Sequence, residues 1–212
     1  MGPSNENLEM LAQSYKAETR EDLTLVYDQW AASYDAHASE RKSAQPGAVA
    51  RVSLELITNK DASILDVGAG TGLIGETLRR GGLHNLAALD PSEKMLAVAR
   101  AKGIYQSYHQ NYLGDRLPFK AGAFDAIVAS GIFTTGHVNA SVFPELNRLL
   151  KTSGKVIFSL NTKLLSDAGF KRLLEQSEGL NWYVERVGKE FDMMDSRYST
   201  AKAVVVALRK LA

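Results

Sequence analysis

The stretch Ile64-Leu65-Asp66-Val67-Gly68-Ala69-Gly70-Thr71-Gly72 decides the fold. It joins a short apolar run, with an acidic residue near its carboxyl end, to three alternating glycines. Apolar residues on both faces predict a strand in a parallel sheet that is covered on both sides. Glycines are needed where the backbone turns sharply and touches a ligand, because a Cβ would prevent both. A helix that begins beyond them offers free N–H groups and the positive end of its dipole. The stretch therefore predicts a ligand-binding turn; the alternative interpretation is a tight turn without a ligand.

Short apolar segments alternate with amphipathic ones from residue 60 onward. Strands are expected at 64–67, 85–90, 105–111, 124–130 and 155–160, and helices at 72–80, 93–102, 142–150 and 169–176. This alternation with short loops predicts a right-handed, doubly wound α/β sheet. The tail differs, because two strand-like segments at 181–194 and 199–209 are separated by a very short connection. Such a connection joins only antiparallel strands.

The first 60 residues have a helical pattern. Leu23, Tyr27, Trp30 and Tyr34 recur at three- and four-residue steps, and a second helix is expected over 49–57 with Pro46 in its first turn. We therefore expect an N-terminal helical cap or lid at 1–60 and a Rossmann-like domain at 61–212. The predicted fold class is α/β, with a mainly parallel seven-stranded sheet that ends in an antiparallel C-terminal hairpin.

Composition excludes several classes of protein. The 212 residues are 45% hydrophobic and 23% charged, which supports an ordinary core, and no cysteine is present for a disulfide, a thiolate metal site or a cysteine nucleophile. The net charge of +1 favours neither nucleic acid nor an anionic membrane as partner. The longest apolar run, Ala203–Leu208, is too short to span a bilayer, and the polar N-terminus does not resemble a secretory signal. The expected location is the cytoplasm, with access to the nucleus left open.

The glycine turn fits two classes of ligand. Gly70 to Gly75 reads G-x-G-x-x-G, and Asp90 follows about 20 residues later, as in dinucleotide-binding proteins. In that fingerprint, however, the first glycine ends the strand, a place that Gly68 takes here. The only catalytic pair for a nicotinamide enzyme would be Tyr198-x-x-x-Lys202, which opens a β-branched run rather than lying on a helix. An NAD(P)-dependent oxidoreductase is therefore the alternative hypothesis.

Four motifs in order resemble the class I S-adenosylmethionine (SAM) dependent methyltransferases. They are the turn at 66–72, the second-strand acid and turn at 89–95, Leu117-Pro118-Phe119 with Phe124-Asp125, and the lead-in to the fifth strand at 149–155. The segments at 27–35, 136–138 and 144–146 resemble in particular the Williams–Beuren-region methyltransferase-like proteins. The resemblance covers roughly residues 25–160. It implies methyl transfer from SAM, without a metal, to a small-molecule or protein acceptor by a monomer or weak homodimer.

The resemblance also implies the site residues. Asp90 would accept from the ribose hydroxyls, the glycine turn would approach the methionyl and ribose groups, and Asp66 would lie near the ammonium. Adenine would lie near Met95, with Asn111 and Tyr112 in a place where many relatives have Asp. The full expected cofactor-binding set is Tyr34, Asp66, Gly68, Ala69, Gly70, Gly72, Asp90, Pro91, Met95, Asn111, Tyr112, Ser130 and Gly131.

Two further expectations concern catalysis. Tyr34 or Trp30 would close over the sulfonium, where an aromatic face gains cation–π stabilisation; the alternative is plain packing of a lid. His137, after the fourth strand, is the only candidate for a general base, and the alternative is a loop histidine without a role. Because an in-line displacement mainly needs alignment and exclusion of water, the base is optional. A SAM-binding protein that has lost catalysis is a further alternative.

Overall fold

A mixed eight-stranded sheet forms the centre of the molecule. The computed structural model describes residues 4–134, 138–175 and 181–211, and its strands follow the order β3-β2-β1-β4-β5-β8-β6, with β7 also paired to β8. The strands are β1 (Ile64–Val67), β2 (Leu86–Asp90), β3 (Ser107–Gln110), β4 (Phe124–Phe133), β5 (Leu150–Asn161), β6 (Trp182–Val187), β7 (Phe191–Asp192) and β8 (Lys202–Lys210). The predicted α/β class is confirmed, with β7 as a short additional strand.

The first five strands are parallel, and in the tail β8 runs antiparallel to them. β1 lies between β2 and β4, and β8 runs antiparallel to both β5 and β6. The short tail connection had predicted this change of direction. Because β1 is central, its carboxyl end, where the glycine turn begins, lies at the point where the strand order reverses. Open α/β sheets bind ligands at such a point.

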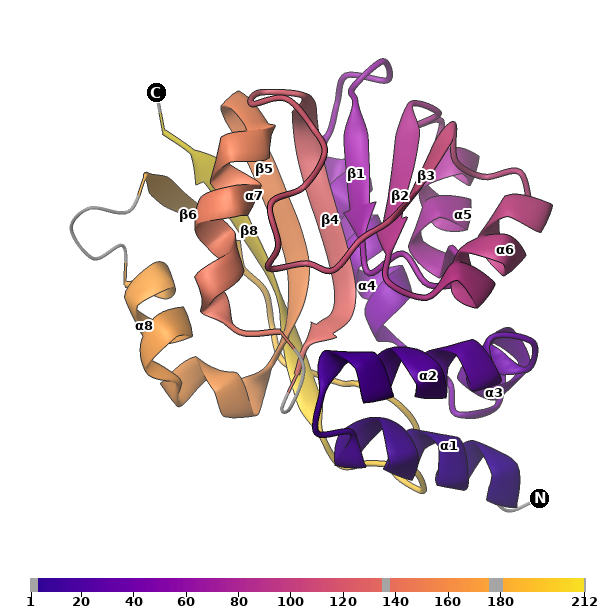
Figure 1. Ribbon diagram of the computed structural model, residues 1–212. Helices are drawn as coiled ribbons and strands as arrows, with labels where there is room; N and C mark the ends of the chain where they lie inside the picture. The colour runs from indigo at the N-terminus through magenta and orange to yellow at the C-terminus, as the bar shows by residue number, and fades with distance from the viewer. Residues whose placement is uncertain (1–3, 135–137, 176–180, 212) are drawn as a thin grey trace.

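Helices cover both faces of the sheet (Figure 1). On one face lie α4 (Gln45–Leu56), α5 (Leu73–Arg80) and α6 (Glu93–Ala101), and on the other α7 (Phe143–Leu149) and α8 (Ala168–Leu174). Neighbouring strand residues therefore pack into different cores: Ile64 lies in the first cluster and Leu65 in the second. Burial on both faces explains why the central strands are apolar throughout. Two single turns, η1 (Ala140–Val142) and η2 (Thr162–Ser166), precede α7 and α8.

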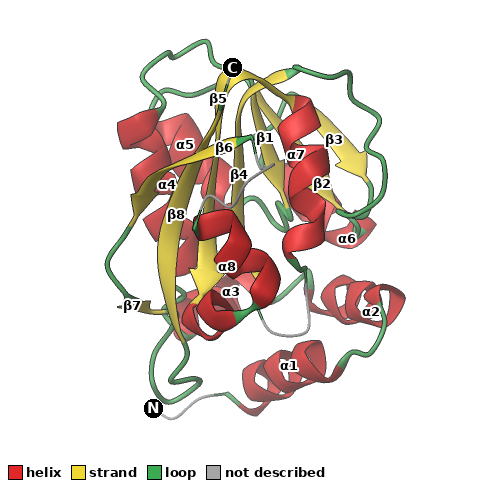
Figure 2. Ribbon diagram, turned by 90° about the vertical axis from the view of Figure 1, so that its left-hand side faces the viewer, coloured by secondary structure: helices red, strands yellow, loops and turns green. Residues whose placement is uncertain are grey.

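Three short helices form a cap beside the carboxyl ends of the parallel strands (Figures 1 and 2). They are α1 (Asn5–Lys16), α2 (Arg20–Trp30) and α3 (Tyr34–Glu40). The sequence predicted one continuous helix through Tyr34, whereas the structure has a break between Trp30 and Tyr34. The aromatic pattern nevertheless holds, because Tyr27, Trp30 and Tyr34 pack in one cluster across the break.

Candidate functional site

The glycine turn leaves one stretch of backbone uncovered. Gly68, Gly70 and Gly72 all have positive φ, at 68°, 54° and 93°. A Cβ on Gly68 would lie 2.3 Å from Ile132 Cγ2, and one on Gly72 would lie 2.7 Å from Ile104 Cδ1, so both sites lack room for any side chain. A Cβ on Gly70 would meet nothing within 4 Å. Gly70 therefore presents bare backbone to open space, as a ligand-binding turn requires.

The Asp90 carboxylate fixes this turn from the neighbouring strand. Asp90 is the last residue of β2, and its Oδ2 accepts from the Gly70 N–H at 2.8 Å while Oδ1 accepts from the Ser92 N–H at 2.9 Å. Burial raises the pKa of Asp90 to about 6, against the lowering effect of these two hydrogen bonds. A carboxylate offers about four lone-pair sites, so both oxygens keep acceptor capacity for a ligand.

Asp66 lies behind the turn. Its Oδ2 accepts from the Tyr105 hydroxyl at 2.6 Å, whereas its buried Oδ1 has no hydrogen-bond partner. Burial raises the pKa of Asp66 to about 7, and the nearby Asp90 acts in the same direction, while the Tyr105 hydrogen bond opposes them. The resemblance implied that Asp66 lies near a ligand ammonium, but Asp66 does not line the cavity described next.

A cavity of about 400 Å³ lies between the cap, the glycine turn and the end of β4. This volume is in the range of ordinary ligand sites. Nine of the thirteen expected cofactor-binding residues line it: Tyr34, Gly68, Gly70, Asp90, Pro91, Met95, Tyr112, Ser130 and Gly131. Met95 lines the cavity, and it is also 1% exposed and packs with Trp30 and Ala31.

The other expected residues lie elsewhere. Ala69 lines a smaller hollow next to the cavity, which it shares with Gly68, Gly70 and Gly131. Gly72 serves close packing of α5 against Ile104, and Asn111 is next to the cavity wall without being part of it. His137 lies outside the described residues.

The cap contributes residues that sequence reasoning did not place in the site. The Thr24 hydroxyl donates to the Tyr112 hydroxyl at 3.2 Å, and the Arg20 guanidinium lies 4.4 Å from the centre of the Tyr112 ring. Arg20 also pairs with Asp115 at 2.9 Å. Arg20, Thr24 and Tyr27 all line the cavity. Their spacing on α2 is the only sequence signal for them, and it does not reveal which loop faces the helix.

Of Tyr34 and Trp30, which were both considered as the residue that closes over the sulfonium, only Tyr34 lines the cavity. Trp30 is 1% exposed, and its indole nitrogen donates to His37 Nδ1 at 2.8 Å. The Tyr34 ring packs edge-on against Trp30, with 5.0 Å between ring centres. Trp30 therefore forms the cap's own small core and supports Tyr34 from behind.

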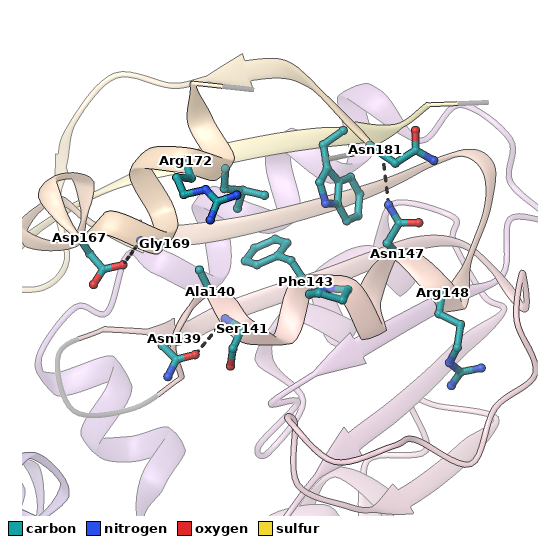
Figure 3. Close-up of a pocket in the computed structure, with 13 residues that line it drawn as sticks. Asn139, Ala140, Ser141, Phe143, Asn147, Arg148, Asp167, Gly169, Arg172 and Asn181 are labelled. Atoms are coloured by element: carbon teal, nitrogen blue, oxygen red, sulfur yellow. Dashed lines mark hydrogen bonds between the residues drawn. The ribbon is translucent and has the colours of Figure 1, made fainter. Parts of the chain in front are cut away.

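A second hollow, of about 800 Å³, lies between α7 and α8 on the far side of the cap (Figure 3). Phe143, Asn147, Arg148 and Arg172 lie around it, and Trp182 is also among its lining residues. It is larger than the first cavity but more open. Neither the glycine turn nor a buried carboxylate reaches it, so the chemistry points to the smaller cavity.

Tyr198 and Lys202, the pair expected of a nicotinamide enzyme, line neither of these two cavities. Tyr198 lies in the loop between β7 and β8, beside Glu40, and Lys202 begins β8, where it pairs with Glu190 and Asp192. Neither residue lines the cavity at the glycine turn. Within the described ranges, no helix is long and apolar enough to cross a bilayer, and no group of three His, Asp or Glu side chains could hold a metal ion.

Comparison with solved structures agrees with this fold. The [4+2]-cyclase SpnF covers 92% of the chain and 97% of its own length, at a TM-score of 0.73 and 15% identity. A putative S-adenosyl-L-methionine-dependent methyltransferase from Methanococcus maripaludis covers 87% and 94%, at a TM-score of 0.63 and 14% identity. At such low identity these likenesses support the fold alone.

Comparison of sequences finds similarity to methyltransferases. Residues 65–158 match the model of a methyltransferase domain. Human methyltransferase-like protein 27 is 34% identical over 156 residues, which are 70% of this chain and 61% of the human protein. Malonyl-[acyl-carrier protein] O-methyltransferase of Geobacter sulfurreducens is 28% identical over 203 residues, 90% of this chain and 69% of that protein. An 18S rRNA (guanine(1575)-N(7))-methyltransferase of Saccharomyces cerevisiae is 38% identical over 78 residues.

The chain spans less than two thirds of the length of the first of these relatives. The match nevertheless includes the glycine turn, Asp90 and the lead-in to β5, which are the motifs that predicted the family from the sequence. Residues 65–158 are therefore similar to a methyltransferase domain, in agreement with the resemblance to the class I S-adenosylmethionine-dependent methyltransferases.

Proposed function

We propose that the chain binds SAM in the 400 Å³ cavity and transfers its methyl group to an acceptor that enters beneath the cap. The observation that carries this proposal is the Asp90 carboxylate, which lines the cavity while it holds the Gly70 backbone. The two carboxylate oxygens of Asp90 suit a ligand with vicinal hydroxyls, and the exposed backbone at Gly70 leaves room for a compact charged group. The match of residues 65–158 to a methyltransferase domain also supports SAM as the ligand.

The residues of the cavity fit SAM in three respects. The bare backbone at Gly70 and Gly131 gives room, since a Cβ there would meet nothing closer than 3.9 Å. Met95, Leu113 and Val142 offer an apolar wall for a purine, at the end that Tyr112 closes. Behind the turn, outside the cavity lining, Asp66 Oδ1 is an unpaired buried acceptor, and the carboxyl would favour a cationic ligand in its ionised form.

Bound SAM would supply a methyl group on a sulfonium: the acceptor's nucleophile would form a bond to the methyl carbon in line as the carbon–sulfur bond breaks, and the electrons of that bond would leave with S-adenosylhomocysteine. The chain would contribute alignment and exclusion of water, where the largest proximity effects arise. Asp90 would orient the ribose, and the ring of Tyr34 would lie against the positive end of the donor. The cap, which covers the strand ends, would keep bulk water from the reacting atoms.

His137 remains the proposed general base for acceptors that must lose a proton. It follows β4 in the sequence, and Ser130, Gly131 and Ile132 of β4 line the cavity. If the acceptor is already ionised at neutral pH, no base is needed, and His137→Asn would leave the turnover number unchanged. A turnover number that falls at least tenfold, with unchanged SAM affinity, would support the base.

The decisive experiment titrates SAM into wild-type protein and into Asp90→Ala by calorimetry. Loss of charge-assisted hydrogen bonds worth about 1.5–3 kcal/mol predicts roughly 10- to 100-fold weaker binding. Asp61→Ala is the matched control, because Asp61 is an exposed aspartate in the loop before β1. Thermal unfolding checks that both variants fold. Equal SAM affinity in folded Asp90→Ala would contradict the assignment.

The second candidate function is SAM binding without methyl transfer, as an interaction module. This candidate is kept because one fold supports several chemistries. We propose a small-molecule or protein acceptor, and a cytoplasmic monomer or weak homodimer without nucleic-acid or membrane partners. Formation of S-adenosylhomocysteine with small acids, phenols, peptides and ribosomal RNA, the last because of the yeast relative, tests both points.

A further inference from the structure

Arg41 is a buried cation without an anionic partner. It follows α3, is 3% exposed, and enters none of the ion pairs of the described residues. Its Nη1 donates one long hydrogen bond, of 3.4 Å, to Asn7 Oδ1, and its buried Nε has no hydrogen-bond partner. Burying a charge without pairing it is costly, so an unpaired guanidinium in a small cap requires an explanation.

Aromatic rings account for only part of this. The guanidinium carbon lies 5.0 Å from the ring centres of both Trp30 and Tyr34, which gives cation–π stabilisation. Neither ring accepts the in-plane N–H groups of the guanidinium, of which there are five. Glu40 precedes Arg41 in the chain, but its carboxylate already accepts hydrogen bonds from Ser4 and Asn7, and the nearby Tyr198 hydroxyl together with these groups holds the pKa of Glu40 well below its usual range.

Arg41 lines a small side pocket that adjoins the SAM cavity. The pocket has a volume of about 50 Å³, and it shares Tyr27, Tyr34 and Gly131 with the cavity. Besides Arg41, its polar lining includes Ser43, Gln45 and Thr134, and no Asp or Glu is among its lining residues. Tyr34 and Gly131 therefore separate a donor-rich recess from the place where the methyl donor is proposed to bind.

We propose that this side pocket binds a carboxylate group of the methyl acceptor, with Arg41 as its main partner. The planar fork of a guanidinium matches a carboxylate with two parallel hydrogen bonds. The recess is small enough that the rest of the acceptor must lie along Tyr27 and Tyr34, which favours a flat apolar or aromatic body. The assignment rests on the proposed function for the identity of the acceptor, but the pocket itself can be tested independently.

Arg41 is thereby a substrate-binding residue that selects acidic acceptors. A carboxylate partner would also explain why the Arg41 guanidinium is buried at this pocket rather than exposed to solvent. A carboxylate at Arg41 would bring the acceptor within reach of the cavity on the side of Tyr34 and Gly131, where both spaces meet.

The test uses benzoate as the probe and benzamide as its neutral isostere, titrated by NMR into protein saturated with S-adenosylhomocysteine. We expect benzoate to bind at least tenfold more tightly than benzamide. Arg41→Met should weaken benzoate binding at least tenfold, and Arg41→Lys should weaken it less. Arg51→Met is the matched control, because Arg51 is exposed on α4. Equal binding of benzoate and benzamide, or no benzoate binding, would overturn the proposal without any variant.

The outcomes separate this proposal from the one on which it rests. S-adenosylhomocysteine affinity should stay within about twofold in Arg41→Met if the side pocket serves only the acceptor. If the wild-type protein fails to bind S-adenosylhomocysteine, the proposed function fails, and benzoate titration of the free protein still decides the pocket. Benzoate binding that is unchanged in folded Arg41→Met would overturn the role of Arg41.

Discussion

At the scale of single residues, Gly70 and Gly103 are a matched pair: their backbone conformation and surroundings are alike, but only Gly70 lines the cavity. Both have positive φ, at 54° and 63°, and a Cβ on either would meet nothing within 4 Å. Alanine at either position should cost a similar free energy of unfolding, about 1–2 kcal/mol, because of the left-handed backbone alone. Only Gly70 lines the cavity, so Gly70→Ala should weaken SAM binding at least tenfold and Gly103→Ala should not. If Gly70→Ala and Gly103→Ala changed the calorimetric SAM affinity equally, Gly70 would not contact the ligand.

The buried carboxyl of Asp66 should make stability depend on pH. Its folded pKa, about 7, is above the ordinary value of 3.8, so the folded state holds a proton that the unfolded state has lost between these values. The free energy of unfolding therefore falls, through this group, as pH rises from about 4 to 7. Asp66→Asn removes the effect and can still accept from Tyr105. Between pH 5 and 8 the variant should gain roughly 2–3 kcal/mol relative to wild type in urea unfolding.

Asp125 is the matched control for this titration. Its pair with Lys151 and its hydrogen bonds from Ser63 lower its pKa below the ordinary value, against burial. Its stabilising effect is therefore present at neutral pH and is lost only in acid. Asp125→Asn should consequently show no relative gain between pH 5 and 8. A relative gain for Asp125→Asn, or none for Asp66→Asn, would contradict the burial argument.

At the scale of elements, polar contacts fasten the cap to the sheet domain. The Ser92 hydroxyl donates to Asp28 of α2, and Asp35 of α3 accepts from Thr71, in the glycine turn, and from Lys102 after α6. Lys102 also pairs with Glu76 of α5 at 2.6 Å. The cap is therefore connected to the glycine turn through the hydrogen bond between Asp35 and Thr71.

Weakening this connection should loosen the cap. Asp35→Asn leaves Lys102 paired with Glu76, so the sheet domain should keep its stability while amide hydrogen exchange in α2 and α3 speeds up severalfold. SAM affinity should fall about threefold to tenfold, because Tyr34 begins α3. Glu93→Gln is the control, since it removes an exposed pair with Arg100 on α6. Unchanged exchange in α2 and α3 would show that packing of the aromatic cluster alone holds the cap.

The elements that could be predicted are those with a strong period. The strands at β1 and β5 and the helices α5 and α6 agree with their predicted ranges within a few residues, because each buries a regular apolar face. α1 was not predicted, since its buried side chains are the polar Asn7 and Ser14, and Asn7 donates to the distant residues His37 and Glu40. The break between α2 and α3 was missed because the aromatic spacing continues across it.

The site could be predicted from the sequence only where one local motif determines it. The turn residues Gly68 and Gly70 and the carboxylate of Asp90 follow from strand ends in a parallel sheet. Thr24 and Arg41 were missed, because which cap residues face the cavity depends on contacts across tens of residues, such as Arg20 with Asp115. The expected residues that line the cavity thus come mostly from the sheet side, and from the cap they include only Tyr34.

At the scale of the whole molecule, the boundary of the folding unit can be placed before α4. The sequence predicted a cap over 1–60, but Val49 and Ala50 of α4 are 0% exposed and belong to the core that includes β1 and α5. By contrast, Trp30 and its neighbours form a separate small cluster. A chain of 44–212 should therefore unfold in urea as one cooperative transition, while a chain of 61–212 should lose that transition and bind a hydrophobic dye, because one face of its sheet is bare. The longer chain lacks Thr24, Tyr27 and Tyr34, so it should also bind SAM at least tenfold more weakly than the full protein. Cooperative unfolding of 61–212 would mean that α4 belongs to the cap, as the sequence had suggested.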